Sequence, residues 1–224
     1  MTPSNAFNNS SASFRTLYIF GCGGSGREIA WLAEQIWGDT VERMFLVDQP
    51  HYLRNSVNGH TVKLLSDTRR DPQARFVVAL GDPSQRRVAA LACSEAGHSP
   101  AVLVHPRAEI SRWVEIGDGT TVCAGCFLST NLGIGRHVQI NVACTVSHDV
   151  QIGDFSTLSP GVHVAGHVRI GREAFIGTGA SIINGSADEP LTIGDGAVIA
   201  AGACVTRAVD PGAMVAGVPA IRKR

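Results

Sequence analysis

The chain has no net charge, because its 224 residues include 19 basic and 19 acidic side chains when histidine is counted as neutral. A balanced surface does not favour nucleic acid or an anionic membrane as a partner. No apolar run is long enough to span a bilayer. Residues 1–14, rich in Ser and Asn, lack the basic-then-apolar order of a signal peptide. We interpret them as a disordered tail.

A second cysteine pair is also missing. Cys123 and Cys126 have the C-x-x-C spacing of half a zinc site, but no matching pair follows. We therefore predict that these cysteines pack rather than bind metal. Cys126 and Cys144 fall on small inward positions of the repeat described next, where a thiol acts as a compact apolar group. This use of cysteine fits a reducing, cytoplasmic location.

What the sequence does have is a six-residue repeat. A branched aliphatic residue recurs at every sixth position from Val104 to Ile182, and a small or β-branched residue lies four positions after most of them. A period of six fits neither a helix, with a period near 3.6, nor an alternating strand, with a period of about 2. It predicts a β-solenoid in which each hexad gives a short strand and a corner. Three hexads close one coil, and coils stack about 4.8 Å apart.

The repeat is interrupted once. The step from Ile182 to Ile193 spans 11 residues rather than 6, which leaves five too many around residues 184–191. A closed coil cannot absorb extra residues, so the segment must loop outward at a corner. It either caps a site or is neutral decoration, and the sequence leaves both readings open.

Residues 15–103 have the pattern of a small parallel α/β domain. An apolar strand at residues 17–20 precedes the turn Gly21-Cys22-Gly23-Gly24-Ser25-Gly26 and an amphipathic helix at 27–37, so G-x-G-x-x-G stands in its usual context. The N–H groups at such a helix start can receive a phosphate. Asp48 follows a strand at 44–47, where an acid suits a ribose or a base. There are two alternative interpretations of this turn. The turn could only pack the helix on the strand, or it could bind NAD.

Among the histidines, His148 has the context best suited to chemistry. It lies two residues after the aliphatic Val146, so we expect it to point outward at a corner, and Asp149 follows directly. A carboxylate beside an imidazole can hold its tautomer and favour the imidazolium, which makes a general base. We interpret His137, His163 and His167 as solvated surface groups.

These features together resemble one family. The G-x-G-G-x-G-R-E turn, the hexapeptide solenoid, the Ser147-His148-Asp149 corner and the terminal Gly217-Val218-Pro219-Ala220 are similar to bacterial sugar acetyltransferases of the sialic-acid O-acetyltransferase type. That family includes N-acetyltransferases acting on nucleotide-linked 4-amino-sugars of the bacillosamine, viosamine and perosamine pathways. The resemblance covers residues 17–220. It implies a Rossmann-like nucleotide-sugar domain (15–103) and a left-handed parallel β-helix (104–224) that forms homotrimers with active sites between subunits.

The resemblance also implies roles for single residues. His148 would be the general base, and Asp149 would raise its basicity. Thr157 stands where some members carry a second histidine that touches the acetyl carbonyl, so a hydroxyl, a backbone N–H or nothing would make that contact. The sugar nucleotide would bind at Gly23, Gly24, Ser25, Asp48 and Gly81, with Asn141 near the acceptor. Acetyl-CoA would bind along Thr157, Gly166, Thr178, Ala201 and Gly202.

We therefore expect acetyl-CoA-dependent N-acetylation of a nucleotide-linked amino-sugar of the 4-amino-4,6-dideoxy type, by direct transfer and without a metal, in polysaccharide biosynthesis. O-acetylation of sialic acid or another sugar is the alternative within the family. A γ-type carbonic anhydrase would need three histidines around zinc, and the spacings here do not match one. A non-catalytic nucleotide-binding trimeric scaffold is the alternative from another class. The base and the sugar are left open.

Overall fold

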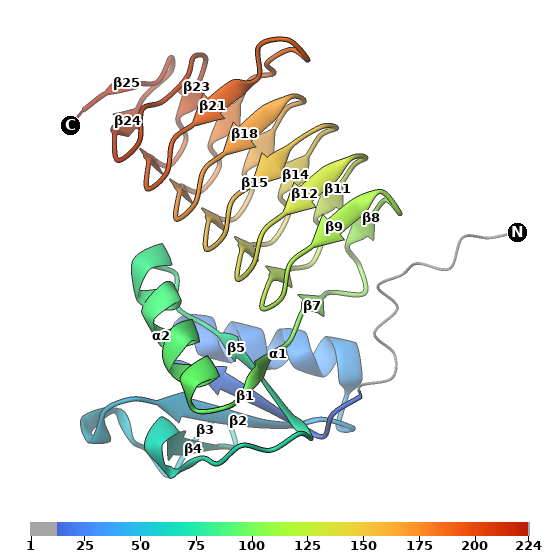
Figure 1. The fold of residues 1–224 in the computed structure, drawn as a ribbon, viewed down its shortest axis with the longest axis vertical. Coiled ribbons are helices and arrows are strands. Elements are labelled where there is room, and N and C mark those ends of the chain that lie inside the picture. The colour runs from blue at the N-terminus through green and yellow to red at the C-terminus, as the bar shows by residue number, and fades with distance from the viewer. Residues whose placement is uncertain (1–12, 224) are drawn as a thin grey trace, which may run out of the picture.

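The computed structural model describes residues 13–223, which form an α/β part followed by a long β-helix (Figure 1). The α/β part has a six-stranded sheet in the order β3-β4-β2-β1-β5-β6, covered by helices α1 (Gly24–Trp37) and α2 (Pro83–Glu95). Alternate residues of one strand face the two helices: Leu17 and Ile19 pack with α1, whereas Tyr18 and Phe20 pack with α2. The strands are β1 (Thr16–Phe20), β2 (Glu42–Val47), β3 (Ser56–Val57), β4 (His60–Leu64), β5 (Ala74–Val78) and β6 (Ser99–Pro100), with short 3₁₀ turns η1 (Pro50–Tyr52) and η2 (Leu65–Asp67).

The expected strands at residues 17–20 and 44–47 and the expected helix are confirmed as β1, β2 and α1. Helix α1 begins three residues before the expected start, and Gly38 ends it with a left-handed φ of 57°. The β3–β4 hairpin is an addition to the expected elements, although Asn58-Gly59 is a typical two-residue hairpin turn with both φ angles positive. Strand β4 extends the sheet in parallel beside β2.

The expected tail, residues 1–14, lies outside the described residues except for Ser13 and Phe14. The Phe14 ring packs edge-on against Trp37, with 5.2 Å between centroids. Within residues 13–223, neither helix is long and apolar enough to cross a membrane. Strand β7 crosses the expected boundary at 103/104: Leu103 packs with the α/β part and Val104 with the β-helix core. The division into domains stays a prediction.

The β-helix has three faces, each a stack of short parallel strands. Residues 18 apart in the sequence are Cα partners, as in the series Val104, Val122, Ile140 and Leu158. This register confirms three hexads per coil. One stack holds β7 (Leu103–Val104), β10 (Thr121–Val122), β13 (Gln139–Ile140), β16 (Thr157–Leu158), β19 (Phe175–Ile176), β22 (Val198–Ile199), β24 (Met214–Ala216) and the antiparallel β25 (Ile221–Arg222). The second stack holds β8 (Glu109–Ile110), β11 (Phe127–Leu128), β14 (Thr145–Val146), β17 (His163–Val164), β20 (Ser181–Ile182) and β23 (Cys204–Val205). The third stack holds β9 (Val114–Ile116), β12 (Leu132–Ile134), β15 (Gln151–Ile152), β18 (Val168–Ile170) and β21 (Leu191–Ile193).

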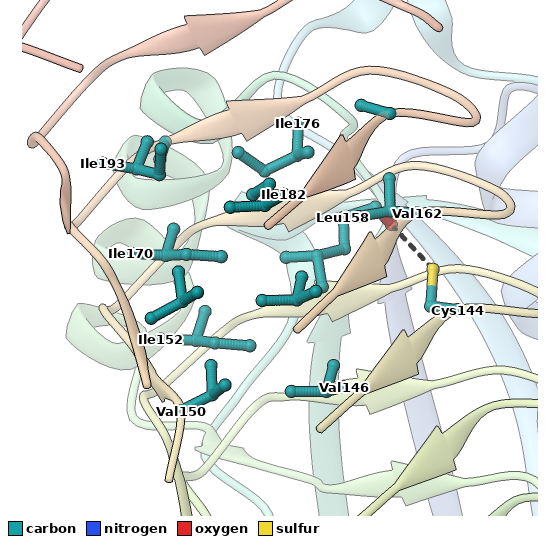
Figure 2. Packing of buried hydrophobic residues seen from close by; sticks show 14 of the residues in the cluster. Cys144, Val146, Val150, Ile152, Leu158, Val162, Ile170, Ile176, Ile182 and Ile193 are labelled. Carbon is teal, nitrogen blue, oxygen red and sulfur yellow. Dashed lines mark hydrogen bonds between the residues drawn. The ribbon is translucent and has the colours of Figure 1, made fainter. Parts of the chain in front are cut away.

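The aliphatic positions fill the interior of this prism (Figure 2). Ile140, Leu158 and Ile176 are fully buried in one stack. Cys126 and Cys144 are buried among them as free thiols, and the Cys144 thiol points at the carbonyl of Ser159, 3.2 Å away. The packing role expected for these two cysteines is confirmed.

Each coil turns at three corners, where one residue takes a left-handed backbone conformation. Equivalent corners of successive coils lie above one another, and we give each such series of corners one letter. Corner A lies between the third stack and the first, corner B between the first and the second, and corner C between the second and the third. Corner A holds Gly119, His137, Phe155, Glu173 and Gly196; corner B holds Gly125, Ala143, Gly161, Gly179 and Gly202; corner C holds Asn131, Asp149 and His167.

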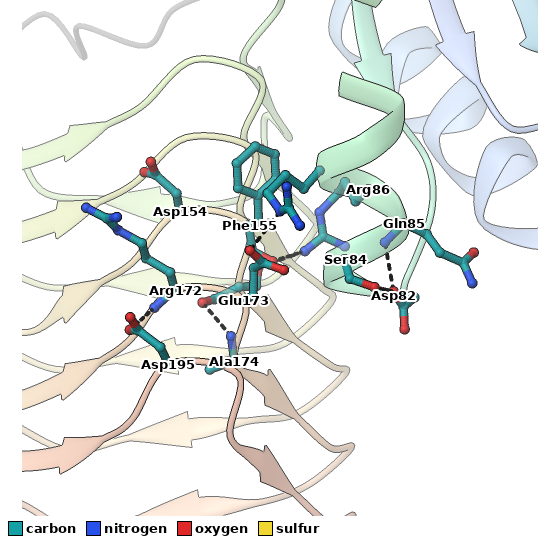
Figure 3. A network of polar contacts seen from close by, with 12 residues as sticks. Asp82, Ser84, Gln85, Arg86, Asp154, Phe155, Arg172, Glu173, Ala174 and Asp195 are labelled. Atoms are coloured by element: carbon teal, nitrogen blue, oxygen red, sulfur yellow. Dashed lines mark hydrogen bonds and ion pairs between the residues drawn. The ribbon is translucent and has the colours of Figure 1, made fainter. Parts of the chain in front are cut away.

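The α/β part packs against corner A and the first stack through one buried cation (Figure 3). Arg86 of α2 is 1% exposed, and its guanidinium donates to the carbonyls of Leu80 (2.7 Å) and His137 (2.9 Å) and to the Thr157 hydroxyl (2.9 Å). It also donates to the carbonyls of Gly81, Phe155 and Ser156. Burial lowers the pKa of Arg86 to about 10, so the group stays protonated at neutral pH.

His137 lies in the same junction, so the expectation of a solvated imidazole is wrong. Its ring is 8% exposed and stacks on Phe155, with 5.1 Å between centroids and an interplanar angle of 6°. Phe76 of the α/β sheet lies against the same ring at 5.8 Å. Burial, followed by the charge of Arg86, lowers the pKa of His137 to about 4. The imidazole is therefore uncharged at neutral pH, and it contributes to the junction by packing.

We predict that Arg86→Met destabilises the protein by about 3 kcal/mol, because several buried acceptors lose their donor at once. Arg87→Met is the matched control. Arg87 is the next residue of α2, and its ion pair with Glu173 (2.9 Å) joins side chains that are 44% and 31% exposed, so its loss should cost about 1 kcal/mol or less. Urea unfolding of both variants measures the difference. Equal stabilities would show that the guanidinium does not hold the junction.

Candidate active site

His148 and Asp149 form a hydrogen-bonded pair at corner C. Strand β14 ends at Val146, and the chain turns through Asp149, whose φ is 57°. His148 Nδ1 lies 2.8 Å from Asp149 Oδ2, and the two side chains are 52% and 38% exposed. With Nδ1 facing the carboxylate, Nε2 is the ring nitrogen left for a ligand. The expected outward-pointing pair is thus present in the structure.

Two further side chains reach the same carboxylate, and the sequence analysis did not connect them with it. Asn131 Nδ2 donates to Asp149 Oδ1 at 3.1 Å, and His167 Nε2 lies 3.9 Å from Oδ2. The hydrogen bond from His148, followed by that from Asn131, lowers the pKa of Asp149. Asn131 and His167 stand 18 residues before and after Asp149, so the coil length itself would have revealed them. The reading of His167 as a free surface group is therefore corrected, whereas His163 is exposed on β17 as expected.

Gly166 lies directly beneath the His148 ring. A Cβ at this position would come within 2.6 Å of Cε1 of His148, so any side chain would displace the imidazole. Beside corner C, a depression of about 370 Å³ is lined by Trp113, Asn131, Gly133 and Gln151 among others. Corner C thus combines a fixed imidazole with open space.

The expected nucleotide residues meet at the carboxyl edge of the α/β sheet. Gly23 caps α1 without a side-chain hydrogen bond, and nothing lies within 4 Å of a Cβ built on it. Gly23 and Gly24 are exposed, and Ser25 is half-buried. Asp48 borders a depression of about 510 Å³ with Leu80 and, from α2, Ser84 and Arg87. Gly81 lies three residues after the end of β5, and its carbonyl accepts hydrogen bonds from Arg86 and Thr157.

A second depression, of about 480 Å³, continues from the first around the start of α2. Ser84 lines both, and the second one adds Asp82, Glu173, Phe175 and Val198. It therefore runs from the α/β part onto the first stack of the β-helix. Ser84 and Arg87 were not singled out from the sequence, since exposed polar residues on a helix have no distinguishing pattern.

The expected acetyl-CoA residues do not gather in one place within this chain. Gly166 lies at corner C, but Thr178, Ala201 and Gly202 lie at corner B, where the Gly202 N–H bonds the Thr178 carbonyl at 2.8 Å. Asn141 also precedes corner B, and its amide donates to the Leu158 carbonyl at 2.8 Å. The second stack separates the two corners.

Thr157 cannot line an acetyl-CoA groove, and this expectation is corrected. The residue is 2% exposed, and its hydroxyl accepts from Arg86 and donates to the Gly81 carbonyl at 3.1 Å. Thr157 points into the junction with the α/β part because it stands in the first stack, nine residues (half a coil) after His148.

The insertion at residues 184–191 emerges at corner C, one coil after His167. The Gly185 N–H bonds the Gly166 carbonyl at 3.1 Å, and the Leu191 N–H bonds the His167 carbonyl at 3.0 Å. Both ends of the loop are thus fastened to the coil that carries Gly166. Of the two readings left open, this position favours a cap over the site.

The chain is similar to known acetyltransferases along nearly its whole length. A family model described as the hexapeptide repeat of succinyl-transferase matches residues 167–207. A GDP-perosamine N-acetyltransferase of Escherichia coli O157:H7 is 36% identical over 206 residues, covering 90% of this chain and 93% of that relative.

Solved structures give the same result. The acetyltransferase domain of PglB from Neisseria gonorrhoeae FA1090, in complex with acetyl coenzyme A, is 34% identical with a TM-score of 0.82, covering 93% of this chain and 99% of that one. PerB from Caulobacter crescentus, in complex with CoA and GDP-perosamine, is 28% identical with a TM-score of 0.84, covering 96% and 100%. The chain therefore belongs to the hexapeptide-repeat acetyltransferase family.

Proposed function

We propose that this protein transfers an acetyl group from acetyl-CoA to the amine of a nucleotide-linked 4-amino-4,6-dideoxy sugar. The observation that carries the proposal is the His148–Asp149 pair at an exposed corner of an acetyltransferase fold. Two of the three relatives, the Escherichia coli enzyme and PerB, act on or hold GDP-perosamine, which favours N-acetylation over O-acetylation of a sialic acid and favours GDP as the nucleotide. Residues 15–103 would hold the nucleotide and residues 104–224 would carry out the transfer, in the cytoplasm.

The proposed mechanism is direct transfer in a ternary complex. Asp149 accepts the hydrogen bond of Nδ1–H of His148, which leaves the lone pair on Nε2 free. The neutral amine attacks the thioester carbonyl while Nε2 takes its proton, and the tetrahedral centre then collapses to the amide and expels the CoA thiolate. Holding both substrates together supplies the rest of the acceleration through proximity.

A second copy of the chain is needed to assemble this site, and we propose a homotrimer of left-handed prisms. The nucleotide part of one chain packs on corner A and the first stack, whereas His148 stands at corner C, which the third stack separates from corner A. If the second stack of each chain faces the threefold axis, corner C of one chain meets corner B of the next. His148 and Gly166 then face Asn141, Thr178, Ala201 and Gly202 of a neighbour. Phe127, 47% exposed on that stack, would be covered.

We predict that His148→Ala lowers kcat by about 10²–10⁴, the usual contribution of a positioned base. The affinity for the nucleotide should not change, because the nucleotide part lies on the other side of the prism. Steady-state kinetics with GDP-perosamine and acetyl-CoA, combined with calorimetric titration of GDP, separate the two effects. Wild-type turnover in this variant would remove His148 from the mechanism.

We predict that GDP raises the melting temperature more than UDP, dTDP or CMP, since a ligand that binds the native state stabilises it by RT ln(1 + [L]/Kd). The four nucleotides are compared at one concentration in a thermal-shift assay, with and without acetyl-CoA. Asp48→Asn should reduce the shift caused by GDP and leave that caused by acetyl-CoA unchanged. A larger shift with another base would identify a different sugar nucleotide.

We predict that two inactive variants restore each other in mixed trimers. His148→Ala removes the base at corner C, and Thr178→Trp blocks the groove at corner B. Random 1:1 assembly in a co-refolding experiment puts intact versions of both corners at about a quarter of the sites, so about a quarter of wild-type activity should return. No recovery, in trimers shown to be mixed by mass spectrometry, would place both corners of a site in one chain.

A further inference from the structure

The His148–Asp149–His167 cluster contains one more group than the proposed transfer uses. The mechanism needs the first two residues, but the structure places a second imidazole against the same carboxylate. Among residues 13–223, these three side chains form a group whose potential ligand atoms all lie within 4.8 Å of one another. The rings of His148 and His167 stand edge to face, 5.1 Å apart at an interplanar angle of 82°.

From this geometry we infer that corner C is a site for Zn²⁺, held by His148 Nδ1, one Asp149 carboxylate oxygen and His167 Nε2. Two imidazoles and a carboxylate are a ligand set that zinc accepts, with Zn–N and Zn–O distances of about 2.0–2.2 Å. Three protein ligands leave the fourth tetrahedral position to water. Tetrahedral ligands at such distances lie about 3.4 Å from one another, so the pair of atoms at 2.8 Å must open slightly and the pair at 3.9 Å must close.

The coil presents these ligands in a nearly fixed arrangement. The His167 N–H bonds the His148 carbonyl at 3.1 Å, and the Asp149 N–H bonds the Thr130 carbonyl at 3.1 Å, so the three backbones are locked in register. Asn131 holds Oδ1 of Asp149 from the coil before, which leaves Oδ2 directed at both imidazoles. Asn131 therefore acts as an outer partner that orients the ligating carboxylate.

Zinc binding and the proposed transfer exclude each other. The metal takes the Nδ1 lone pair and the carboxylate oxygen that otherwise fix the tautomer of His148. A ring bound through Nδ1 carries its proton on Nε2, the atom that must accept the proton of the amine. Zinc is thus an inhibitor of this enzyme rather than its cofactor, and its removal should not lower activity.

The binding test uses zinc chloride alone, with the full-length protein and no substrate, so its outcome does not depend on the proposed function. Isothermal titration of wild-type protein should give one zinc per chain. His167→Gln should weaken that binding by about tenfold or more, because one of three ligands is lost. His51→Gln is the matched control, since His51 is an exposed imidazole of the α/β part outside the cluster. Asp149→Asn, which retains the volume of the side chain, serves as a second variant.

Equal affinity in wild type and His167→Gln, or an equal loss in His51→Gln, would show only scattered surface binding and overturn the inference. Activity gives a second readout: zinc should inhibit the wild type, EDTA should restore it, and the zinc concentration for half inhibition should rise about tenfold in His167→Gln relative to its own metal-free rate. Loss of activity in EDTA, or unchanged inhibition in His167→Gln, would contradict an inhibitory site at corner C.

Discussion

The structure depends on the parallel hydrogen-bond ladder that keeps successive coils in register. From Val104 to Ile176, each short strand of the first stack pairs with the strand 18 residues later, without a slip. Strands of two or three residues have little stability alone, so the order of each coil comes from its neighbours. The ladder also converts sequence distance into contact. It is the reason that Asn131, Asp149 and His167, from three different coils, share one corner.

The second constraint is the junction with the α/β part. Arg86 satisfies carbonyls on both sides of the junction, and it has no carboxylate within hydrogen-bonding distance among the described residues. A buried cation solvated by carbonyl dipoles requires all of them in place, so the angle between the two parts is narrowly defined. This holds the depression beside Asp48 next to corner A and the first stack, whereas His148 stands at corner C. The proposed homotrimer rests on that geometry.

Much of this could be predicted from the sequence, because the regular features come from local rules. The period of six gave the prism, the aliphatic core and the outward His148–Asp149 pair, and the Gly-rich turn gave α1. The features that could not be predicted depend on contacts between segments that are distant in the sequence. Thr157 and His137 are polar residues of the kind that is usually exposed, and they are buried because the α/β part docks on them. His167 was missed because its partner lies one coil away, and the β3–β4 hairpin because β3 has only two residues.

The loop at residues 184–191 leaves and re-enters its coil through hydrogen bonds to adjacent residues, Gly166 and His167. Strand β21 therefore resumes the stack beside β18 without any shift, whatever the length of the segment between. The length and sequence of this loop beside the candidate site can therefore change without disturbing the interior of the prism. A scaffold of this type can diversify its choice of acyl donor or acceptor while its architecture stays constant.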